Sequence, residues 1–193
     1  MAFVGEPPQS EGARRLYEAD LAEGYVANYN RVWAWRPELV EGLRALWMQA
    51  REDTSLEDRD FAVLVAATAA ELGDSYCSLA WGGKLAALTS EETAAAVIRG
   101  RETALTDRDV ALARWARRVV RDPNATTKDD VQALRDVGLG DKEILEVTAF
   151  VAFRLAFSTV NDALGAQPDS KLAEDAPEAV RRAVSYGRPP ASN

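Results

Sequence analysis

The sequence predicts an all-α protein, and three observations support that fold class. Apolar residues recur every three or four positions between polar segments, as at Leu39, Leu43 and Leu46. Several threonines stand three positions before a carboxylate, which is the pattern of a helix N-terminal capping box. No β-branched run alternates with a period of two, and neither an Asn-Gly nor an Asp-Gly hairpin turn occurs. Together these features predict helices joined by short turns.

The first half of the chain divides into five predicted helices, at 12–22, 25–34, 37–51, 56–72 and 75–87. Pro37 opens the third helix, because its fixed φ suits the first helical turn. The pair Thr54 and Glu57 caps the fourth. Gly73 then ends it, since glycine readily takes the left-handed conformation found at helix ends. The small residues Ala66–Ala70 in the fourth helix let a neighbouring helix approach closely.

The second half continues in the same way, with helices predicted at 90–99, 107–121, 127–137 and 141–164. Capping pairs precede the first three of them, at Thr89/Glu92, Thr106/Asp109 and Thr126/Asp129. The stretch Lys142–Leu164 is apolar around most of its circumference, so we expect it to be the central buried helix.

The chain is predicted to be one domain over residues 1–193, because no linker or internal repeat divides it. Its core is expected at about 20–168. The ends, 1–11 and 169–193, are rich in proline, serine, glycine and charge, so we expect them to be flexible or draped over a neighbouring element.

Composition excludes several classes of function. There are 23 Lys and Arg residues against 31 Asp and Glu residues, a net charge of −8, which argues against nucleic acid or an anionic membrane as partner. The absence of histidine excludes Ser-His-Asp and Cys-His catalysis and histidine-ligated metals, and a single cysteine excludes an internal disulfide. We therefore expect no metal and no cofactor. Neither a signal peptide nor a membrane span is evident, so a cytoplasmic protein with a reduced thiol is expected.

Cys77 is the one strongly nucleophilic side chain, and it follows a predicted joint between two helices. Asp74 is expected to cap the second helix, which places Cys77 in its first turn, where the helix dipole favours a thiolate. The carboxylate of Asp74 opposes this effect if it lies close. Trp81 falls one turn further along the same face and could form an apolar wall beside the sulfur.

Each of these residues also has a purely structural interpretation. A lone cysteine in a helical protein is commonly a small buried apolar residue, Trp81 with Tyr76 can simply belong to the core, and Asp74 can be only a cap. Glu71 is an anomaly at a helix end, because its charge opposes the dipole there. The aromatic segment Tyr25–Pro37 could line a ligand cleft or an oligomer interface, or could belong to the core.

Two polar residues interrupt the apolar stretch Lys142–Leu164 seven positions apart, and hence on one helical face: Arg154 and Asn161. A buried arginine needs a carboxylate partner, so a structural ion pair at Arg154 is the simplest expectation.

Several segments resemble the alkylhydroperoxidase D-like, or carboxymuconolactone decarboxylase-like, superfamily. They are the joint around Cys77, the helix start Thr106–Asp109, the phrase Val131–Glu146 and the segment Val160–Gly165, and the likeness covers about residues 20–168. The resemblance implies an all-α fold that assembles into dimers, trimers or hexamers. It also implies either thiol-based reduction of organic hydroperoxides or a decarboxylating lyase reaction.

The family's peroxidase pattern is only partly present. That pattern is a glutamate, then Cys-x-x-Cys-x-x-x-His, in which the second cysteine attacks the peroxide; Cys77 matches this second cysteine. Asp74 replaces the resolving cysteine, Trp81 replaces the histidine, and the upstream glutamate would fall near Ala62. A two-cysteine cycle is therefore impossible within the chain, and an external thiol or partner protein would have to reduce an oxidised Cys77.

Three hypotheses follow. In the first, the protein is a one-cysteine peroxidase acting on organic hydroperoxides, with Cys77 as nucleophile, Asp74 or Tyr76 handling protons, and Trp81 lining the pocket. In the second, it is a lyase in which Asp74 and Glu71 act as acid and base. In the third, it is a helical oligomer without chemistry that binds a small apolar ligand. Its Ala-rich helices and five tryptophans fit a homo-oligomer, but the sequence gives neither substrate, reductant nor subunit number.

Overall fold

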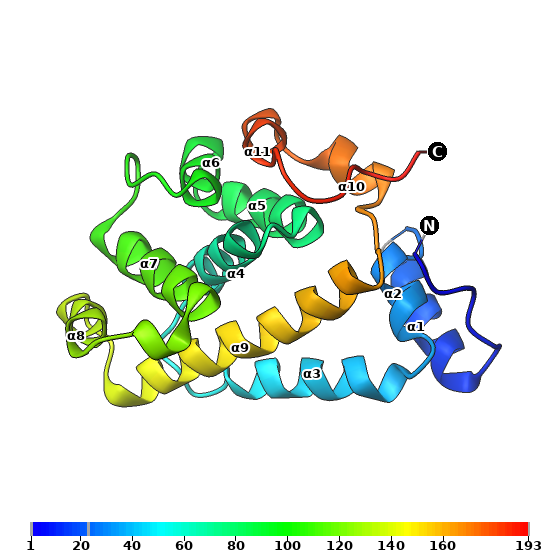
Figure 1. The fold of residues 1–193 in the computed structure, drawn as a ribbon, viewed down its shortest axis with the longest axis horizontal. Helices are drawn as coiled ribbons and strands as arrows, with labels where there is room; N and C mark the ends of the chain where they lie inside the picture. The colour runs from blue at the N-terminus through cyan, green and yellow to red at the C-terminus, as the bar shows by residue number, and fades with distance from the viewer. Residues whose placement is uncertain (1, 23, 193) are drawn as a thin grey trace.

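The structure, a computed structural model, describes residues 2–22 and 24–192, which form helices and connecting loops without any strand (Figure 1). The all-α prediction is confirmed. The helices, in order, are α1 (Glu11–Ala22), α2 (Asn28–Trp33), α3 (Pro37–Gln49), α4 (Asp58–Leu72), α5 (Ser75–Leu88), α6 (Glu91–Arg99), α7 (Asp107–Arg121), the 3₁₀ turn η1 (Pro123–Ala125), α8 (Lys128–Asp136), α9 (Asp141–Ala163), α10 (Ser170–Asp175) and α11 (Glu178–Ala183).

The central helix is α4, where the sequence predicted α9. Ten consecutive residues of α4, 60–69, are buried, and the helix packs against α5, α6, α7 and α9. By contrast, α9 runs beside α3 along one side of the molecule (Figure 1). There it exposes Leu145, Ala152 and Ala156. Alanine occurs both in protein interiors and on surfaces. A helix that is apolar around most of its circumference is therefore not necessarily buried on every side.

Helix capping differs from the prediction at three of the four predicted sites. The box at Thr106 and Asp109 forms as predicted. Two caps lie one residue later than predicted because the predicted hydroxyls bond backward: Thr89 to the carbonyl of Leu85 and Thr126 to that of Pro123. The residues that cap α4, α6 and α8 are Glu57 with Asp60, Ser90, and Thr127 with Asp130.

The C-terminal residues, expected to be flexible or draped over a neighbour, form two short helices that lie over α5 and α6 (Figure 1). Val180 and Ala183 of α11 are buried there. Gly82 of α5 permits this close approach, since a Cβ on it would lie 2.7 Å from a methyl carbon of Val180. Near the N-terminus, the Phe3 amide bonds to the Leu164 carbonyl, which ties that end to α9.

Candidate functional site

Cys77 lies in the first turn of α5, directly after the joint that the sequence predicts. Gly73 ends α4 with a φ of 83°, in the left-handed region that favours glycine. Asp74 then caps α5, and its Oδ1 accepts a 2.9 Å hydrogen bond from the backbone N–H of Cys77. The cap therefore fixes both the carboxylate and the thiol at the same helix start.

The surroundings of Cys77 are apolar and aromatic. The residue is 3% exposed and packs in a cluster with Trp33 and Phe157, whose rings stack with centroids 5.7 Å apart. Trp47 and Trp81, which are partly exposed, pack against the same cluster. Part of the predicted aromatic segment 25–37 thus belongs to the cluster that contains the cysteine, and the predicted wall residue Trp81 packs against that cluster.

Two side chains of α9 direct donors at the sulfur. Arg154 Nη2 lies 3.5 Å from Sγ and Ser158 Oγ lies 3.6 Å from it. They reach the same atom because positions four apart in a helix share a face. We refer to Asp74, Cys77, Arg154 and Ser158 as the thiol cluster.

The electrostatics of the thiol cluster oppose ionisation of the cysteine. Burial raises the pKa of the Cys77 thiol far above its ordinary value, and the charge of Asp74 and its hydrogen bond to the thiol raise it further. Arg154 and Ser158 lower this pKa, but by less than the opposing effects raise it. The resting thiol is therefore protonated, between a carboxylate that can accept a proton and a guanidinium that can stabilise an anion.

The expectation of a carboxylate partner for Arg154 was wrong. Arg154 is 5% exposed, yet no carboxylate in the described part of the chain pairs with it, and its Nε has no partner. Its guanidinium carbon instead lies 4.7 to 5.3 Å from the ring centroids of Trp47, Phe157 and Trp81. Cation–π contacts and a sulfur acceptor stabilise the charge less than a carboxylate would.

Further unpartnered polar atoms lie beside the thiol cluster. Within the part of the chain that the structure describes, buried Asp74 Oδ2 has no hydrogen-bond donor and buried Asn161 Nδ2 has no acceptor. Asn161 Oδ1 accepts a 2.8 Å bond from Trp33 Nε1, so the unpaired amide is held in place. Buried polar atoms without partners are uncommon in folded proteins and are a reason to look for function.

The structure separates two of the predicted site residues from this arrangement. Glu71 is ion-paired with Arg117 and Arg121 of α7. The Tyr76 hydroxyl bonds to Asp169, and burial together with that carboxylate raises the pKa of Tyr76 above its usual value. Neither side chain makes a hydrogen bond to the thiol cluster.

Sequence reasoning missed Ser158 and Asp162. Burial and the nearby charge of Asp74 raise the pKa of Asp162 to about 7, despite an opposing effect of Arg188. The sequence signal for Ser158 was its spacing of four from Arg154 on a face already identified as polar. No sequence signal linked Asp162 to Asp74, because the fold alone brings α9 to the α4–α5 joint.

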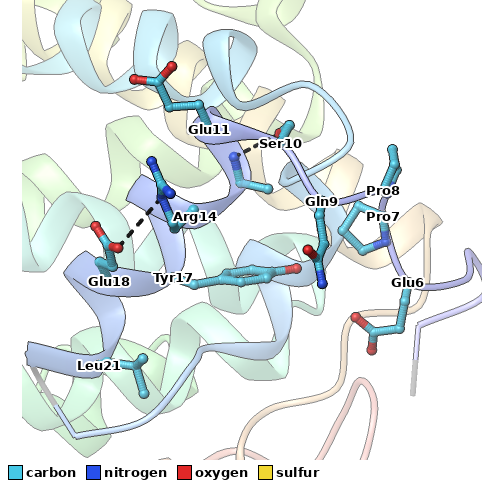
Figure 2. A pocket seen from close by; sticks show the side chains of 11 residues that line it. Glu6, Pro7, Pro8, Gln9, Ser10, Glu11, Arg14, Tyr17, Glu18 and Leu21 are labelled. Atoms are coloured by element: carbon cyan, nitrogen blue, oxygen red, sulfur yellow. Dashed lines mark hydrogen bonds and ion pairs between the residues drawn. The ribbon is translucent and has the colours of Figure 1, made fainter.

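Other candidate sites are weaker. The described residues hold no group of three or more potential metal-ligating side chains. Nor does any helix among them combine the length and apolar character needed to cross a bilayer. A surface groove of about 840 Å³ lies between residues 6–10 and α1, but it contains no residue of the thiol cluster (Figure 2).

Comparison with known proteins supports the fold. No family model and no curated protein matches the sequence. Two uncharacterised peroxidase-related proteins of known structure share the fold with a TM-score of 0.75. The one from Ralstonia eutropha JMP134, described as an alkylhydroperoxidase AhpD core, is 22% identical over 89% of this chain and 94% of its own. The one from Silicibacter sp. TM1040 is 17% identical over 88% and 90%.

A third similar structure is that of the debrominase Bmp8 with 2,3,4-tribromopyrrole. Its TM-score is 0.70, and it is 14% identical over 88% of this chain and 94% of its own. At such identities the likeness defines the fold and not the reaction. The chain has the alkylhydroperoxidase D-like fold, as the resemblance in its sequence predicted.

Proposed function

We propose that the protein is a one-cysteine, thiol-dependent peroxidase that reduces organic hydroperoxides, with Cys77 as the nucleophile. The observation that carries this proposal is the pair of α9 donors, Arg154 and Ser158, aimed at a buried sulfur whose other neighbour is a carboxylate. The aromatic surroundings suit an apolar substrate. The names of two structural neighbours support the same general chemistry.

The first step activates the thiol. The Cys77 proton moves to the Asp74 carboxylate, which leaves a thiolate beside the guanidinium of Arg154 and the hydroxyl of Ser158. Because Asp74 becomes neutral as it takes the proton, the thiolate forms without a second negative charge beside it and pairs with the guanidinium of Arg154. Asp74 thereby takes over the proton transfer that the family's missing histidine cannot supply.

The second step transfers oxygen. The sulfur attacks the terminal oxygen of the hydroperoxide, the S–O bond forms, and the O–O bond breaks. The departing alkoxide takes the proton held by Asp74, so the products are an alcohol and a Cys77 sulfenic acid. One external thiol then forms a mixed disulfide with release of water, and a second restores Cys77 and leaves as a disulfide.

Substrate access requires motion, because the sulfur is buried. Trp47 and Trp81 are partly exposed aromatic neighbours of the cluster, and their displacement would open a path. A protonated, closed resting thiol also resists unwanted oxidation, since reactivity follows thiolate character and exposure.

The test is a peroxide titration of the reduced protein with a sulfenic-acid trapping reagent, read at Cys77 by mass spectrometry. Cumene hydroperoxide should give stoichiometric labelling far faster than a free thiol reacts, and Cys77→Ser should give none. Asp74→Asn should slow labelling by at least tenfold at pH 7, because it removes the proton acceptor while asparagine still caps the helix. Glu71→Gln is the matched carboxylate control and should leave the rate unchanged. Labelling no faster than that of free cysteine would exclude the peroxidase function.

A second candidate is a lyase that uses carboxylates, and the raised pKa of Asp162 favours it. Asp74 and Asp162 interact electrostatically, and a carboxyl group that titrates near 7 suits general acid–base catalysis. The predicted pair of Asp74 with Glu71 is less suitable, because Glu71 is bound by two arginines. If the Cys77→Ser variant still turns over a carboxylic acid and the Asp162→Asn variant does not, the protein is a lyase of this kind.

A further inference from the structure

Arg154 is a permanent cation that is buried without a counter-ion among the described residues. Its Nη2 contacts a sulfur that is protonated at rest, and no atom of the described part of the chain accepts a hydrogen bond from its Nε. A buried guanidinium without a counter-ion lowers the stability of the folded state. An anion that binds there at some stage of function would offset this loss. The unpartnered Nε donor is free to bind such an anion while Nη2 stays on the sulfur.

A second cation lies close to the same aromatic wall. Lys84 Nζ is 4.8 Å from the ring centroid of Trp81, and the guanidinium carbon of Arg154 is 5.3 Å from that centroid. Lys84 is exposed, and it forms no ion pair with the described residues. In a protein of net charge −8, two unpaired cations near one ring form a local positive site that extends from the surface to the buried sulfur.

The neighbours of Arg154 define the rest of the ligand. Trp47 and Phe157 place their rings 4.7 and 5.0 Å from the guanidinium, so an apolar group bound beside it would contact aromatic faces. A ligand that suits this environment combines an apolar ring or branched chain with one anionic group. The anion would bind within a few ångströms of the sulfur, because Arg154 contacts both.

We infer that the site selects anionic apolar substrates, with a carboxylate bound by Arg154 Nε and guided inward past Trp81 by Lys84. For the proposed peroxidase, this means a carboxylate-bearing organic hydroperoxide in preference to a neutral one. The reacting group in this inference rests on the proposed function. The anion site itself does not, because it can be measured with ligands that carry no peroxide.

Binding is tested first, with benzoate and the neutral benzyl alcohol as probes and tryptophan fluorescence as the readout. Benzoate should bind the reduced protein at least tenfold more tightly than benzyl alcohol, with an affinity that falls as salt rises. Arg154→Gln should remove the difference and Arg154→Lys should keep part of it. Lys84→Gln should reduce it, mainly at low salt. Lys128→Gln, an exposed lysine on α8, is the matched control and should change nothing.

Equal binding of the two probes by the wild-type protein would overturn the inference. So would a preference for benzoate that persists in Arg154→Gln. If that variant does not fold, the decision rests on Lys84→Gln and the salt dependence, and a preference insensitive to both would also overturn it. Reaction is tested next: para-carboxycumene hydroperoxide should oxidise Cys77 at least tenfold faster than cumene hydroperoxide. If benzoate binds as expected but neither peroxide oxidises Cys77, the peroxidase proposal fails and the anion site stands.

Discussion

Two groups of charged residues, each built around a buried carboxylate, are hydrogen-bonded to very different degrees. At the starts of α4 and α7, Arg59 pairs with Asp109 and Arg108 pairs with Asp60, each through two hydrogen bonds of 2.5 to 3.0 Å. We call these the α4–α7 ion pairs. In the thiol cluster, by contrast, residues 2–22 and 24–192 provide no carboxylate partner for Arg154 and no donor for one oxygen of Asp74.

This difference in hydrogen bonding indicates what each group does. The carboxylates of the α4–α7 ion pairs also accept backbone hydrogen bonds at their helix starts, Asp60 from Glu57 and Asp109 from Thr106. Charges paired in this way hold the two helices together. The thiol cluster keeps unused donors and acceptors around a nucleophile, which is the pattern of a site that completes its bonds only when substrate binds.

The largest expected effect would come from breaking an α4–α7 ion pair. Asp109→Asn should lower the free energy of unfolding at pH 7 by about 2 to 3 kcal/mol, which is below the range for a fully buried pair because Arg59 is partly exposed. Urea denaturation measures this change. Asp130→Asn is the control, since Asp130 has the same capping role on α8 but is less buried than Asp109 and lies 3.6 Å from its exposed partner Arg118, and it should lose less than about 1 kcal/mol.

The pH dependence of the Asp109 effect has a definite sign. Burial alone would raise the pKa of Asp109, but hydrogen bonds from Arg59 and Thr106 together lower it below its ordinary value. Its contribution to stability is therefore present above the unfolded pKa of about 4 and is lost as the pH falls through the folded value. The wild-type and Asp109→Asn curves should converge in acid. Equal losses for Asp109→Asn and Asp130→Asn would contradict the structural role of the pair.

The sequence predicted the scaffold more fully than it predicted the thiol cluster. Helix periodicity is local, so most element boundaries fell within two residues, and the joint at Gly73 and Asp74 was predicted from neighbouring residues. What brings Cys77 to Arg154 and Ser158 is the packing of α9 against α4, the helix that leads into the α4–α5 joint, and local patterns do not encode this packing. The missing partner of Arg154 could not be foreseen either, because the sequence contains 31 Asp and Glu residues and only the fold shows that none of those in the described ranges pairs with it.

The second prediction tests whether the thiol cluster is kept for function at the expense of stability. Arg154→Met should raise the free energy of unfolding by about 1 to 2 kcal/mol, since an apolar side chain of similar length replaces an unpaired buried cation. The same variant should slow peroxide oxidation of Cys77 by roughly a hundredfold, because the thiolate loses its positive neighbour. Urea denaturation and sulfenic-acid labelling measure the two effects on one protein sample.

The measurement distinguishes the two groups because the same type of substitution should change the free energy of unfolding in opposite directions. Arg59→Met, the matched substitution in an α4–α7 ion pair, should destabilise the protein and leave the oxidation rate unchanged. If Arg154→Met were as destabilising as Arg59→Met, Arg154 would be a structural residue and the contrast between the two groups would fail.

The smallest expected effect concerns Asp162, at the edge of the thiol cluster. Its pKa is raised to about 7 by burial and by Asp74, whereas in the unfolded chain it is near 4. The native state therefore holds this proton more tightly, and the wild-type protein loses stability as the pH rises from 4 to 7. Asp162→Asn keeps the group neutral, so it should be more stable than wild type at pH 8, by less than about 1 kcal/mol after allowance for partial exposure.

The difference between the Asp162→Asn variant and wild type should vanish below pH 4. Asp136→Asn, at an exposed position on α8, is the control and should show no such trend. A constant difference at all pH values would mean that neither burial nor Asp74 raises the pKa of Asp162 in the folded protein, and that the electrostatic influence of the thiol cluster does not extend to Asp162.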